Sequence, residues 1–123
     1  MSKTILIAED EPALLKILTS KIKKLGFEVL TAEDGVEAIE KITKSKPDLV
    51  LLDIVMPRKN GYEVLEEIRV KHHLTTPVII LSNLGMEEDL ETGKNFGVVE
   101  YIIKSNVSLK NLIVTINKNI GSA

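Results

Sequence analysis

Short apolar runs alternate along the chain with longer amphipathic stretches, and this alternation predicts strands and helices in turn. Five runs have the length and composition of buried strands: Thr4–Ala8, Phe27–Thr31, Asp48–Asp53, Pro77–Ser82 and Val98–Ile103. The run that ends at Asp53 is the most apolar and is the predicted central strand. Because an amphipathic stretch follows every run, we expect five β–α units that form a parallel sheet with helices on both faces.

Turn and cap residues set the bounds of the predicted helices. Pro12 suits the first turn of a helix, and Gly26 ends that helix. Asp34, with Glu37 three residues later, resembles a capping box, and Pro47 stops the helix that follows. The other predicted helices run from Gly61 to about Lys71, from about Met86 to Phe96, and from the cap Ser108 to Ile120.

Length and composition are those of one ordinary globular unit, and we expect a single domain over residues 1–123 without an output domain. The net charge of -2 offers no basic excess for nucleic acid or for a membrane surface. The chain has no cysteine, which excludes disulfides, thiolate nucleophiles and cysteine zinc sites. No run is long enough to span a bilayer and no signal-peptide core is present, so a cytoplasmic location is expected.

The carboxyl ends of the predicted strands, where ligands bind in open parallel sheets, carry polar residues of complementary types. Glu9 and Asp10 follow the first strand, and Asp53 ends the third. If these strands are neighbours, the three carboxylates crowd one pocket and raise one another's pKa unless a cation is present. Mg²⁺ prefers such oxygen ligands, so we expect Mg²⁺, or another divalent cation such as Mn²⁺, at Asp10 and Asp53.

Two further strand ends add a hydroxyl and an ammonium group. Ser82 ends the fourth strand and Lys104 follows the fifth. Taken alone, a serine here is an ordinary turn residue and a lysine is an ordinary surface residue. Opposite the carboxylates, Lys104 can form a charge pair and then hold a phosphate oxygen, and Ser82 can donate to the same group. A carboxylate nucleophile, a divalent ion, a lysine and a hydroxyl are the parts needed for phosphoryl transfer to an aspartate.

A set of residues spread over the chain also matches a known family. The most specific segment runs from Pro47 through Asp53 to Pro57 and is followed by Asn60-Gly61. The other matching positions are Glu9, Asp10, Ser82, Tyr101 and Lys104. Together these residues resemble the receiver domain of bacterial response regulators, from about Ile5 to Ile120. The resemblance implies a flavodoxin-like sheet of strand order 2-1-3-4-5, for which the family's chemotaxis regulator is a standard example.

The resemblance implies a role for each of the acidic residues. Asp53 would be the phosphoacceptor. Asp10, Asp53 and the main-chain carbonyl of Val55 would bind Mg²⁺ directly, and Glu9 would act through a water molecule. Lys104 would bind the phosphoryl group.

The resemblance further implies a switch and its partners. Ser82 would move toward the phosphoryl group, and Tyr101 would turn inward behind it. Without the resemblance, Tyr101 would be interpreted as an ordinary half-buried aromatic residue on an edge strand. The phosphoryl donor would be a phosphohistidine on a sensor histidine kinase or a histidine phosphotransfer protein. A downstream target would bind the face made by the fourth helix, fifth strand and fifth helix. The chain would be a signalling switch of a phosphorelay that catalyses only its own phosphorylation and dephosphorylation.

Two positions depart from the family's pattern. Ser105 stands where a proline usually follows the lysine, often after a cis peptide bond, and a cis bond before a non-proline residue costs roughly 2.5–4 kcal/mol. The aim of Lys104 therefore depends on the 104–105 peptide. Asn83 is larger than the small residue that usually follows the switch hydroxyl, so we expect it to narrow access to Asp53 and to slow phosphoryl exchange. Equal dephosphorylation rates in the wild type and Asn83→Ala would contradict this hypothesis.

Other functions use similar residues. An aspartate-dependent phosphohydrolase usually has its nucleophile after the first strand and a second Asp two residues later, but Pro12 and Val55 stand at that spacing from Asp10 and Asp53. A receiver-like scaffold that binds partners without phosphorylation stays open because of the two departures. A nucleotide or flavin binder would need a glycine-rich first loop, whereas Glu9 and its two acidic neighbours would repel a phosphate.

Overall fold

The computed structural model describes residues 2–82, 94–104 and 108–121, and five parallel strands in them form one sheet of order β2-β1-β3-β4-β5. This order and the α/β class confirm the expected flavodoxin-like architecture. The strands are β1 (Thr4–Ala8), β2 (Glu28–Ala32), β3 (Leu49–Asp53), β4 (Val78–Ser82) and β5 (Val98–Ile103). The helices are α1 (Pro12–Lys24), α2 (Gly35–Ser45), α3 (Gly61–Glu66), its π-helical continuation η1 (Glu67–Lys71) and α5 (Leu109–Ile120).

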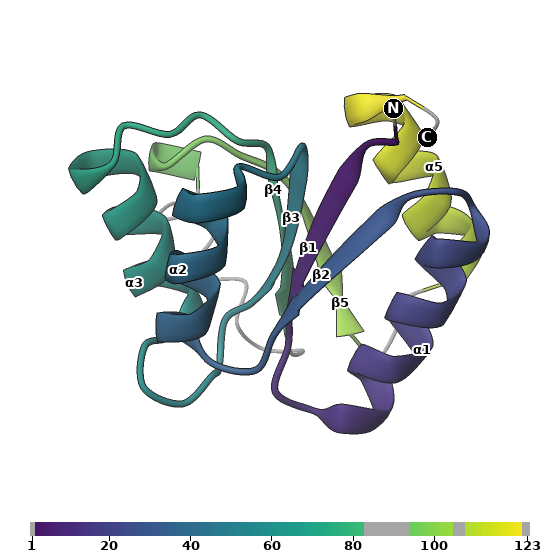
Figure 1. Cartoon of the computed structure of the whole chain (residues 1–123), viewed down its shortest axis with the longest axis horizontal. Coiled ribbons are helices and arrows are strands. Elements are labelled where there is room, and N and C mark those ends of the chain that lie inside the picture. The colour runs from purple at the N-terminus through teal and green to yellow at the C-terminus, as the bar shows by residue number, and fades with distance from the viewer. Residues whose placement is uncertain (1, 83–93, 105–107, 122–123) are drawn as a thin grey trace.

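Helices cover both faces of the sheet, with α2 and α3 on one side and α1 and α5 on the other (Figure 1). Side chains of a strand alternate between the two faces, so each face has its own core. Leu6, Leu52 and Ile80 belong to the core under α2 and α3, which we call the α2/α3 cluster. Ile7 and Leu51 belong to the core under α1 and α5, the α1/α5 cluster. Because β1 and β3 are covered on both faces, their sequences are almost continuously apolar.

The caps show where local sequence signals succeed. The side chain of Asp34 accepts a hydrogen bond from the main-chain N–H of Glu37 at 2.8 Å, as expected. A capping box would also need the Glu37 carboxylate to accept from the N–H of Asp34. This part of the prediction is wrong, because the Glu37 carboxylate accepts from the N–H of Glu33 at 2.7 Å. A complete capping box does occur at α3, between Asn60 and Glu63. The helix caps thus depend on which main-chain amide a carboxylate can reach.

The predicted helix from Gly61 to about Lys71 is present in full, but its last five residues form a π-helical turn. In this turn the N–H of His72 donates to the carbonyl of Glu67 at 3.2 Å, five residues back. Ser108 caps α5 through the N–H of Asn111, as predicted. The helix predicted near residues 86–96 falls largely outside the described residues.

Candidate functional site

Three acidic residues from two neighbouring strands meet at the carboxyl edge of the sheet. Ala8 of β1 lies beside Leu52 of β3, so Glu9 and Asp53, the next residues, are level with one another. Glu9 is 0% and Asp53 is 1% exposed, whereas Asp10 is exposed. One carboxylate oxygen from each of the three lies within 4.8 Å of the other two. The condition on which the sequence prediction depended, that the first and third strands are neighbours, is therefore met.

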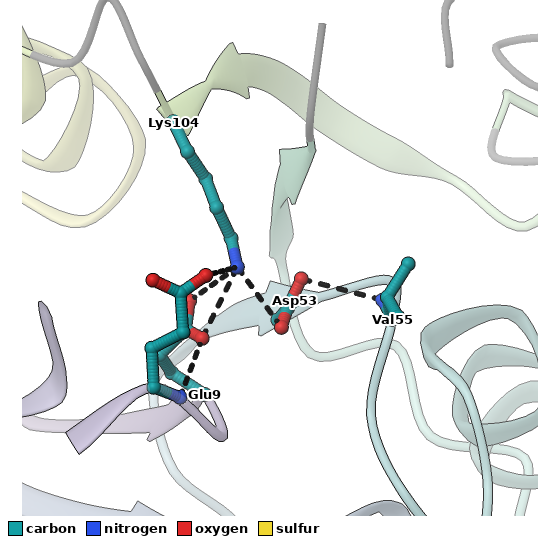
Figure 2. A network of polar contacts seen from close by, with 5 residues as sticks. Glu9, Asp53, Val55 and Lys104 are labelled. Atoms are coloured by element: carbon teal, nitrogen blue, oxygen red, sulfur yellow. Dashed lines mark hydrogen bonds and ion pairs between the residues drawn. The ribbon is translucent and has the colours of Figure 1, made fainter. Parts of the chain in front are cut away.

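Lys104 extends from the end of β5 into this acidic cluster, between Glu9 and Asp53 (Figure 2). Its Nζ lies 2.9 Å from Oε1 of Glu9, 3.0 Å from Oδ2 of Asp53 and 3.3 Å from Oε1 of Glu11. The Lys104 side chain is only 9% exposed, so most of its charge is compensated by carboxylates and not by water. One ammonium group thus faces three carboxylates drawn from two strand ends.

Main-chain groups hold the two buried carboxylates in place. The N–H of Val55 donates to Oδ1 of Asp53 at 3.3 Å, and the N–H of Glu11 donates to Oε2 of Glu9 at 3.0 Å. Helix α3 begins directly against the Asp53 backbone, because a Cβ on Gly61 would lie 2.6 Å from the Asp53 carbonyl oxygen. Only glycine permits this close approach, and it brings the start of α3 to the edge of the site.

Two buried oxygens of the cluster suit a cation. Glu9 Oε1 and Asp53 Oδ2 are buried without a hydrogen-bond partner. The Nζ of Lys104 forms ion pairs with both oxygens, at 2.9 and 3.0 Å, and it donates hydrogen bonds to Oε2 of Glu9 at 3.1 Å and Oε1 of Glu11 at 3.3 Å. Buried oxygens of this kind need a donor or a metal. The donor set, carboxylate oxygens at short mutual distances, fits a hard divalent ion such as Mg²⁺.

Burial raises the pKa of Asp53 from 3.8 to about 7. The ammonium group of Lys104, 3.0 Å from Asp53, lowers this pKa, while the negative charge of Glu9 raises it further. For Lys104, burial disfavours the charged form, but the close carboxylates of Glu9 and Asp53 outweigh it and raise the lysine pKa. In the absence of a metal, the site therefore favours a charged lysine and holds a proton on Asp53 near neutral pH.

This pKa predicts a pH-dependent stability for the metal-free protein. The folded-state pKa of Asp53 lies above its usual value, so the folded protein favours the protonated carboxyl. The contribution of this group to folding stability is therefore complete below about pH 4 and is lost as the pH rises through 7. In a chelating buffer at pH 8.5, the free energy of unfolding of Asp53→Asn is expected to exceed that of the wild type by about 2 kcal/mol. At pH 4.5 no such difference is expected. Urea unfolding at both pH values measures the difference.

Saturating Mg²⁺ provides the control for this prediction. A cation that binds only the folded wild type at ten times its Kd adds about 1.4 kcal/mol, whereas the Asn variant lacks one ligand charge and gains less. A stability gain of Asp53→Asn that is the same at both pH values would show that titration of Asp53 is not the cause.

The remaining predicted site residues lie around this cluster. Ser82 is buried at the end of β4, and Tyr101 is half-buried on the edge strand β5, against the α2/α3 cluster. The side chain of Val55 is 52% exposed. Asn83 and Ser105, with the 104–105 peptide, lie outside the described residues. Glu11 was missed as a contact of Lys104, and its only sequence signal is its place directly after Glu9 and Asp10.

Comparison with sequences of known proteins identifies the family. The model of the response regulator receiver domain matches residues 5–117. A probable transcriptional regulator named ycf27 from Galdieria sulphuraria is 42% identical over 100 residues, which are 81% of this chain and 38% of that protein. Its counterpart from Cyanophora paradoxa is 38% identical over 102 residues, 83% of this chain and 42% of that protein. The chain thus spans about two fifths of the length of these curated relatives.

Solved structures agree with this assignment. The receiver domain of the Francisella response regulator 1452 is 31% identical, with a TM-score of 0.85 and coverage of 95% of both chains. The receiver domain of the sensor histidine kinase PA1611 from Pseudomonas aeruginosa, solved with magnesium in its active site cleft, is 26% identical with a TM-score of 0.86. The two cover 99% of this chain and 100% of that one.

The fold, the acidic cluster and the comparisons agree on one class of protein. The helices in the described ranges are all too short or too polar to cross a bilayer. The sheet order matches that of the chemotaxis protein CheY4 from Vibrio cholerae, which is 25% identical with a TM-score of 0.88 over 98% of this chain and 100% of that one. The chain belongs to the response regulator receiver domain family, the phosphorylation-controlled switches of two-component signalling.

Proposed function

We propose that this receiver domain is phosphorylated on Asp53. The observation that carries the proposal is the Asp53 carboxylate itself, which is 1% exposed, lies 3.0 Å from Lys104 Nζ and shares its pocket with Glu9 and Asp10. Glu9 shares this burial and the same lysine, so the choice of Asp53 between these two carboxylates rests on the resemblance to the receiver family. Such a carboxylate is suited to accept a phosphoryl group when nearby cations neutralise the incoming charge.

The donor we propose is a phosphohistidine on a sensor histidine kinase or a histidine phosphotransfer protein. An oxygen of Asp53 attacks the phosphorus atom while the bond between phosphorus and the imidazole nitrogen breaks. The imidazole leaves, and the product is an acyl phosphate on Asp53. Lys104 holds a phosphoryl oxygen as a point charge, and the N–H of Val55 keeps the carboxylate oriented.

The residues that would hold Mg²⁺ are Asp10, Asp53 and the main-chain carbonyl of Val55, with Glu9 acting through water. Within the described residues, one buried oxygen each of Glu9 and Asp53 accepts no hydrogen bond and is balanced by the charge of Lys104 alone, which supports this assignment. When bound, Mg²⁺ or Mn²⁺ supplies positive charge against the phosphoryl oxygens. Lys104 lies 3.0 Å from Asp53 and would hold a phosphoryl oxygen beside such a cation.

The proposed readout involves Ser82 and Tyr101. Ser82 lies at the end of β4, next to the strand that carries Asp53, and would donate its hydroxyl to the phosphoryl group. Tyr101 would turn inward behind it, and a downstream protein would bind the face of α5, β5 and the fourth helix. We also propose that the whole chain acts as one receiver unit, which catalyses only its own phosphorylation and dephosphorylation.

Intact-mass spectrometry with acetyl phosphate tests this function. The wild-type chain is expected to gain the mass of one phosphoryl group in the presence of Mg²⁺ and to gain none in excess chelator, because the carboxylates alone repel the donor. Readdition of Mg²⁺ or Mn²⁺ should restore the gain. A wild-type chain that gains no mass with Mg²⁺ would contradict the proposal and favour a partner-binding scaffold, and turnover of a generic phosphate ester would favour a phosphohydrolase.

A further inference from the structure

Strand β5 contains one residue that strand β4 does not pair. Val78 lies beside Val98, but Ile79 lies beside Glu100, so the pairing skips Val99. The side chain of Val99 is 42% exposed. Such a bulge bends a strand and changes the direction of later side chains, and it is uncommon between parallel strands.

The skipped residue exchanges the two faces of β5. Side chains of a regular strand share a face when they are two residues apart. Val98 and Tyr101 are three residues apart, yet both pack against the α2/α3 cluster. Ile102 packs against the α1/α5 cluster on the opposite face. If β5 were regular from Val98 onward, Tyr101 and Ile102 would each point to the other face.

The same exchange decides where Lys104 points. Alternation along β1 and β3 directs Glu9 and Asp53 to the side of the α1/α5 cluster, two residues after members of that cluster. Ile102 faces this side too, and Lys104 follows it by two residues. If Val99 were paired with Ile79 and the strand were regular, Lys104 would point to the opposite side and would lie about 3.3 Å further beyond the edge of the sheet. The contact between Lys104 and Asp53 therefore depends on the register of β5.

Arg69 holds the segments that lead into β4 and β5. Its Nε donates to the carbonyl of Phe96 at 2.7 Å, and its two terminal nitrogens donate to the carbonyls of Leu74 at 2.9 Å and Thr76 at 2.7 Å. All three acceptors are main-chain oxygens, so the planar guanidinium ties the backbone of one segment to that of the other. Arg69 lies in the π-helical turn η1, on the α2/α3 side of the sheet.

The positions of these acceptors match the strand pairing. Thr76 lies two residues before Val78, and Phe96 lies two residues before Val98, which is the partner of Val78 in the sheet. Arg69 thus bridges equivalent points just ahead of the first paired residues. Edge strands have the weakest register because only one neighbour pairs with them, and β5 is an edge strand. The guanidinium supplies a second constraint at the amino end of this strand.

We propose that Arg69 and the skipped residue Val99 together set the register of β5 and so position Lys104 against Asp53. Arg69 is then a positioning residue for phosphoryl binding at the opposite edge of the sheet, with which it has no contact. This inference rests on the proposed role of Lys104 in holding the phosphoryl group. In this inference, contacts at the amino end of β5 determine where Lys104 lies at its carboxyl end.

Separate binding measurements for Mg²⁺ and for beryllofluoride, which mimics a phosphoryl group, test the inference. In Arg69→Met, β5 loses its anchor, and Lys104 spends less time in position. The Kd for beryllofluoride at saturating Mg²⁺ is expected to rise about tenfold, the equivalent of one charge-assisted hydrogen bond. The Kd for Mg²⁺ is expected to stay unchanged or to fall, because Lys104 and the cation compete for the same carboxylates.

Matched variants separate positioning from a general loss of stability. Lys71→Met removes an exposed cation from the same π-helical turn and should leave both Kd values unchanged. In a Lys104→Met background, Arg69→Met should cause no further loss of beryllofluoride binding. Deletion of Val99 should leave both Kd values close to those of the wild type, because it keeps Val98 beside Val78 and Glu100 beside Ile79. If Arg69→Met prevents folding, Arg69→Lys, which keeps the charge but not the fork, should show the selective loss.

The outcomes distinguish this inference from the proposed function. A parallel weakening of Mg²⁺ and beryllofluoride binding in Arg69→Met, or no change in beryllofluoride binding, would overturn the positioning role. Failure of the wild type to bind beryllofluoride, or wild-type binding by Lys104→Met, would instead overturn the proposed function of the site. Weakened binding in Lys104→Met with unchanged binding in Arg69→Met would leave the proposed function intact and reject this inference alone.

Discussion

Asp53→Asn is expected to reduce phosphoryl labelling by acetyl phosphate and Mg²⁺ to background, while the domain stays folded. Asparagine keeps the shape of the side chain, but its amide is not a nucleophile and adds no charge to a cation site. Asp10 is exposed, and Glu9, which contacts the same lysine as Asp53, is the carboxylate at which peptide mapping would detect any residual label. Intact-mass spectrometry measures the label, and urea unfolding confirms the fold.

Strand β3 offers a matched control for this loss. Asp48 immediately precedes the strand at its opposite end, is exposed, and accepts a hydrogen bond from the N–H of Thr4 at 2.8 Å. Asp48→Asn keeps an oxygen that can accept this bond, so it should be labelled like the wild type. Peptide mapping that places the phosphoryl group on Asp10, or undiminished labelling of Asp53→Asn, would show that the acceptor has been assigned wrongly.

Gly35→Ala is expected to lower the free energy of unfolding by about 3 kcal/mol. A Cβ at this position would lie 2.1 Å from the carbonyl oxygen of Lys59 and 2.6 Å from its carbonyl carbon. The N–H of Gly35 also donates to the carbonyl of Pro57 at 3.3 Å, so the first turn of α2 lies directly on the loop that follows β3. The clash is with backbone, and it can be relieved only if the helix or the loop moves. Urea unfolding measures the effect.

Gly97→Ala separates this clash from backbone strain. Gly97 has a φ of 73°, but a Cβ there would meet no atom within 4 Å. The expected loss in the free energy of unfolding is therefore only the strain of an alanine in the left-handed backbone conformation, about 1–2 kcal/mol. The loop after β3 also carries Val55, so Gly35→Ala should additionally weaken Mg²⁺ binding, whereas Gly97→Ala should not. Equal losses of stability in the two variants would argue that Gly35 is needed for its conformation and not for close approach.

Local signals predicted the secondary structure to within about one residue at the strand ends. Phe27, Asp48 and Pro77 were assigned to strands that begin one residue later in the structure. For Pro77 the reason is plain, because proline has no N–H to donate to the sheet. The π-helical turn at the end of α3 left no recognisable pattern, because its residues are those of an ordinary amphipathic helix. Its place depends on packing against the sheet and not on composition.

The candidate site was predictable as a set of residue types but not as an arrangement. Strand-end carboxylates, a serine and a lysine could be found because every strand of a parallel sheet delivers its last residues to the same edge. The contact of Glu11 with Lys104 could not be found, because an acidic residue after a strand is ordinary unless a cation is brought near it. The strand order came from the resemblance to a family, and the structure then confirmed it.

The sequence by itself determined five β–α units, an apolar central strand and the chemical groups at its carboxyl edge. These features depend on alternation, caps and turns, which are properties of neighbouring residues. Only the tertiary structure decided that Glu9 and Asp53 are level, that Asp53 is buried deeply enough to raise its pKa, and that Lys104 reaches it. Each of these depends on strand pairing across many residues, including the register of β5, and no local pattern encodes such a sum of distant contacts.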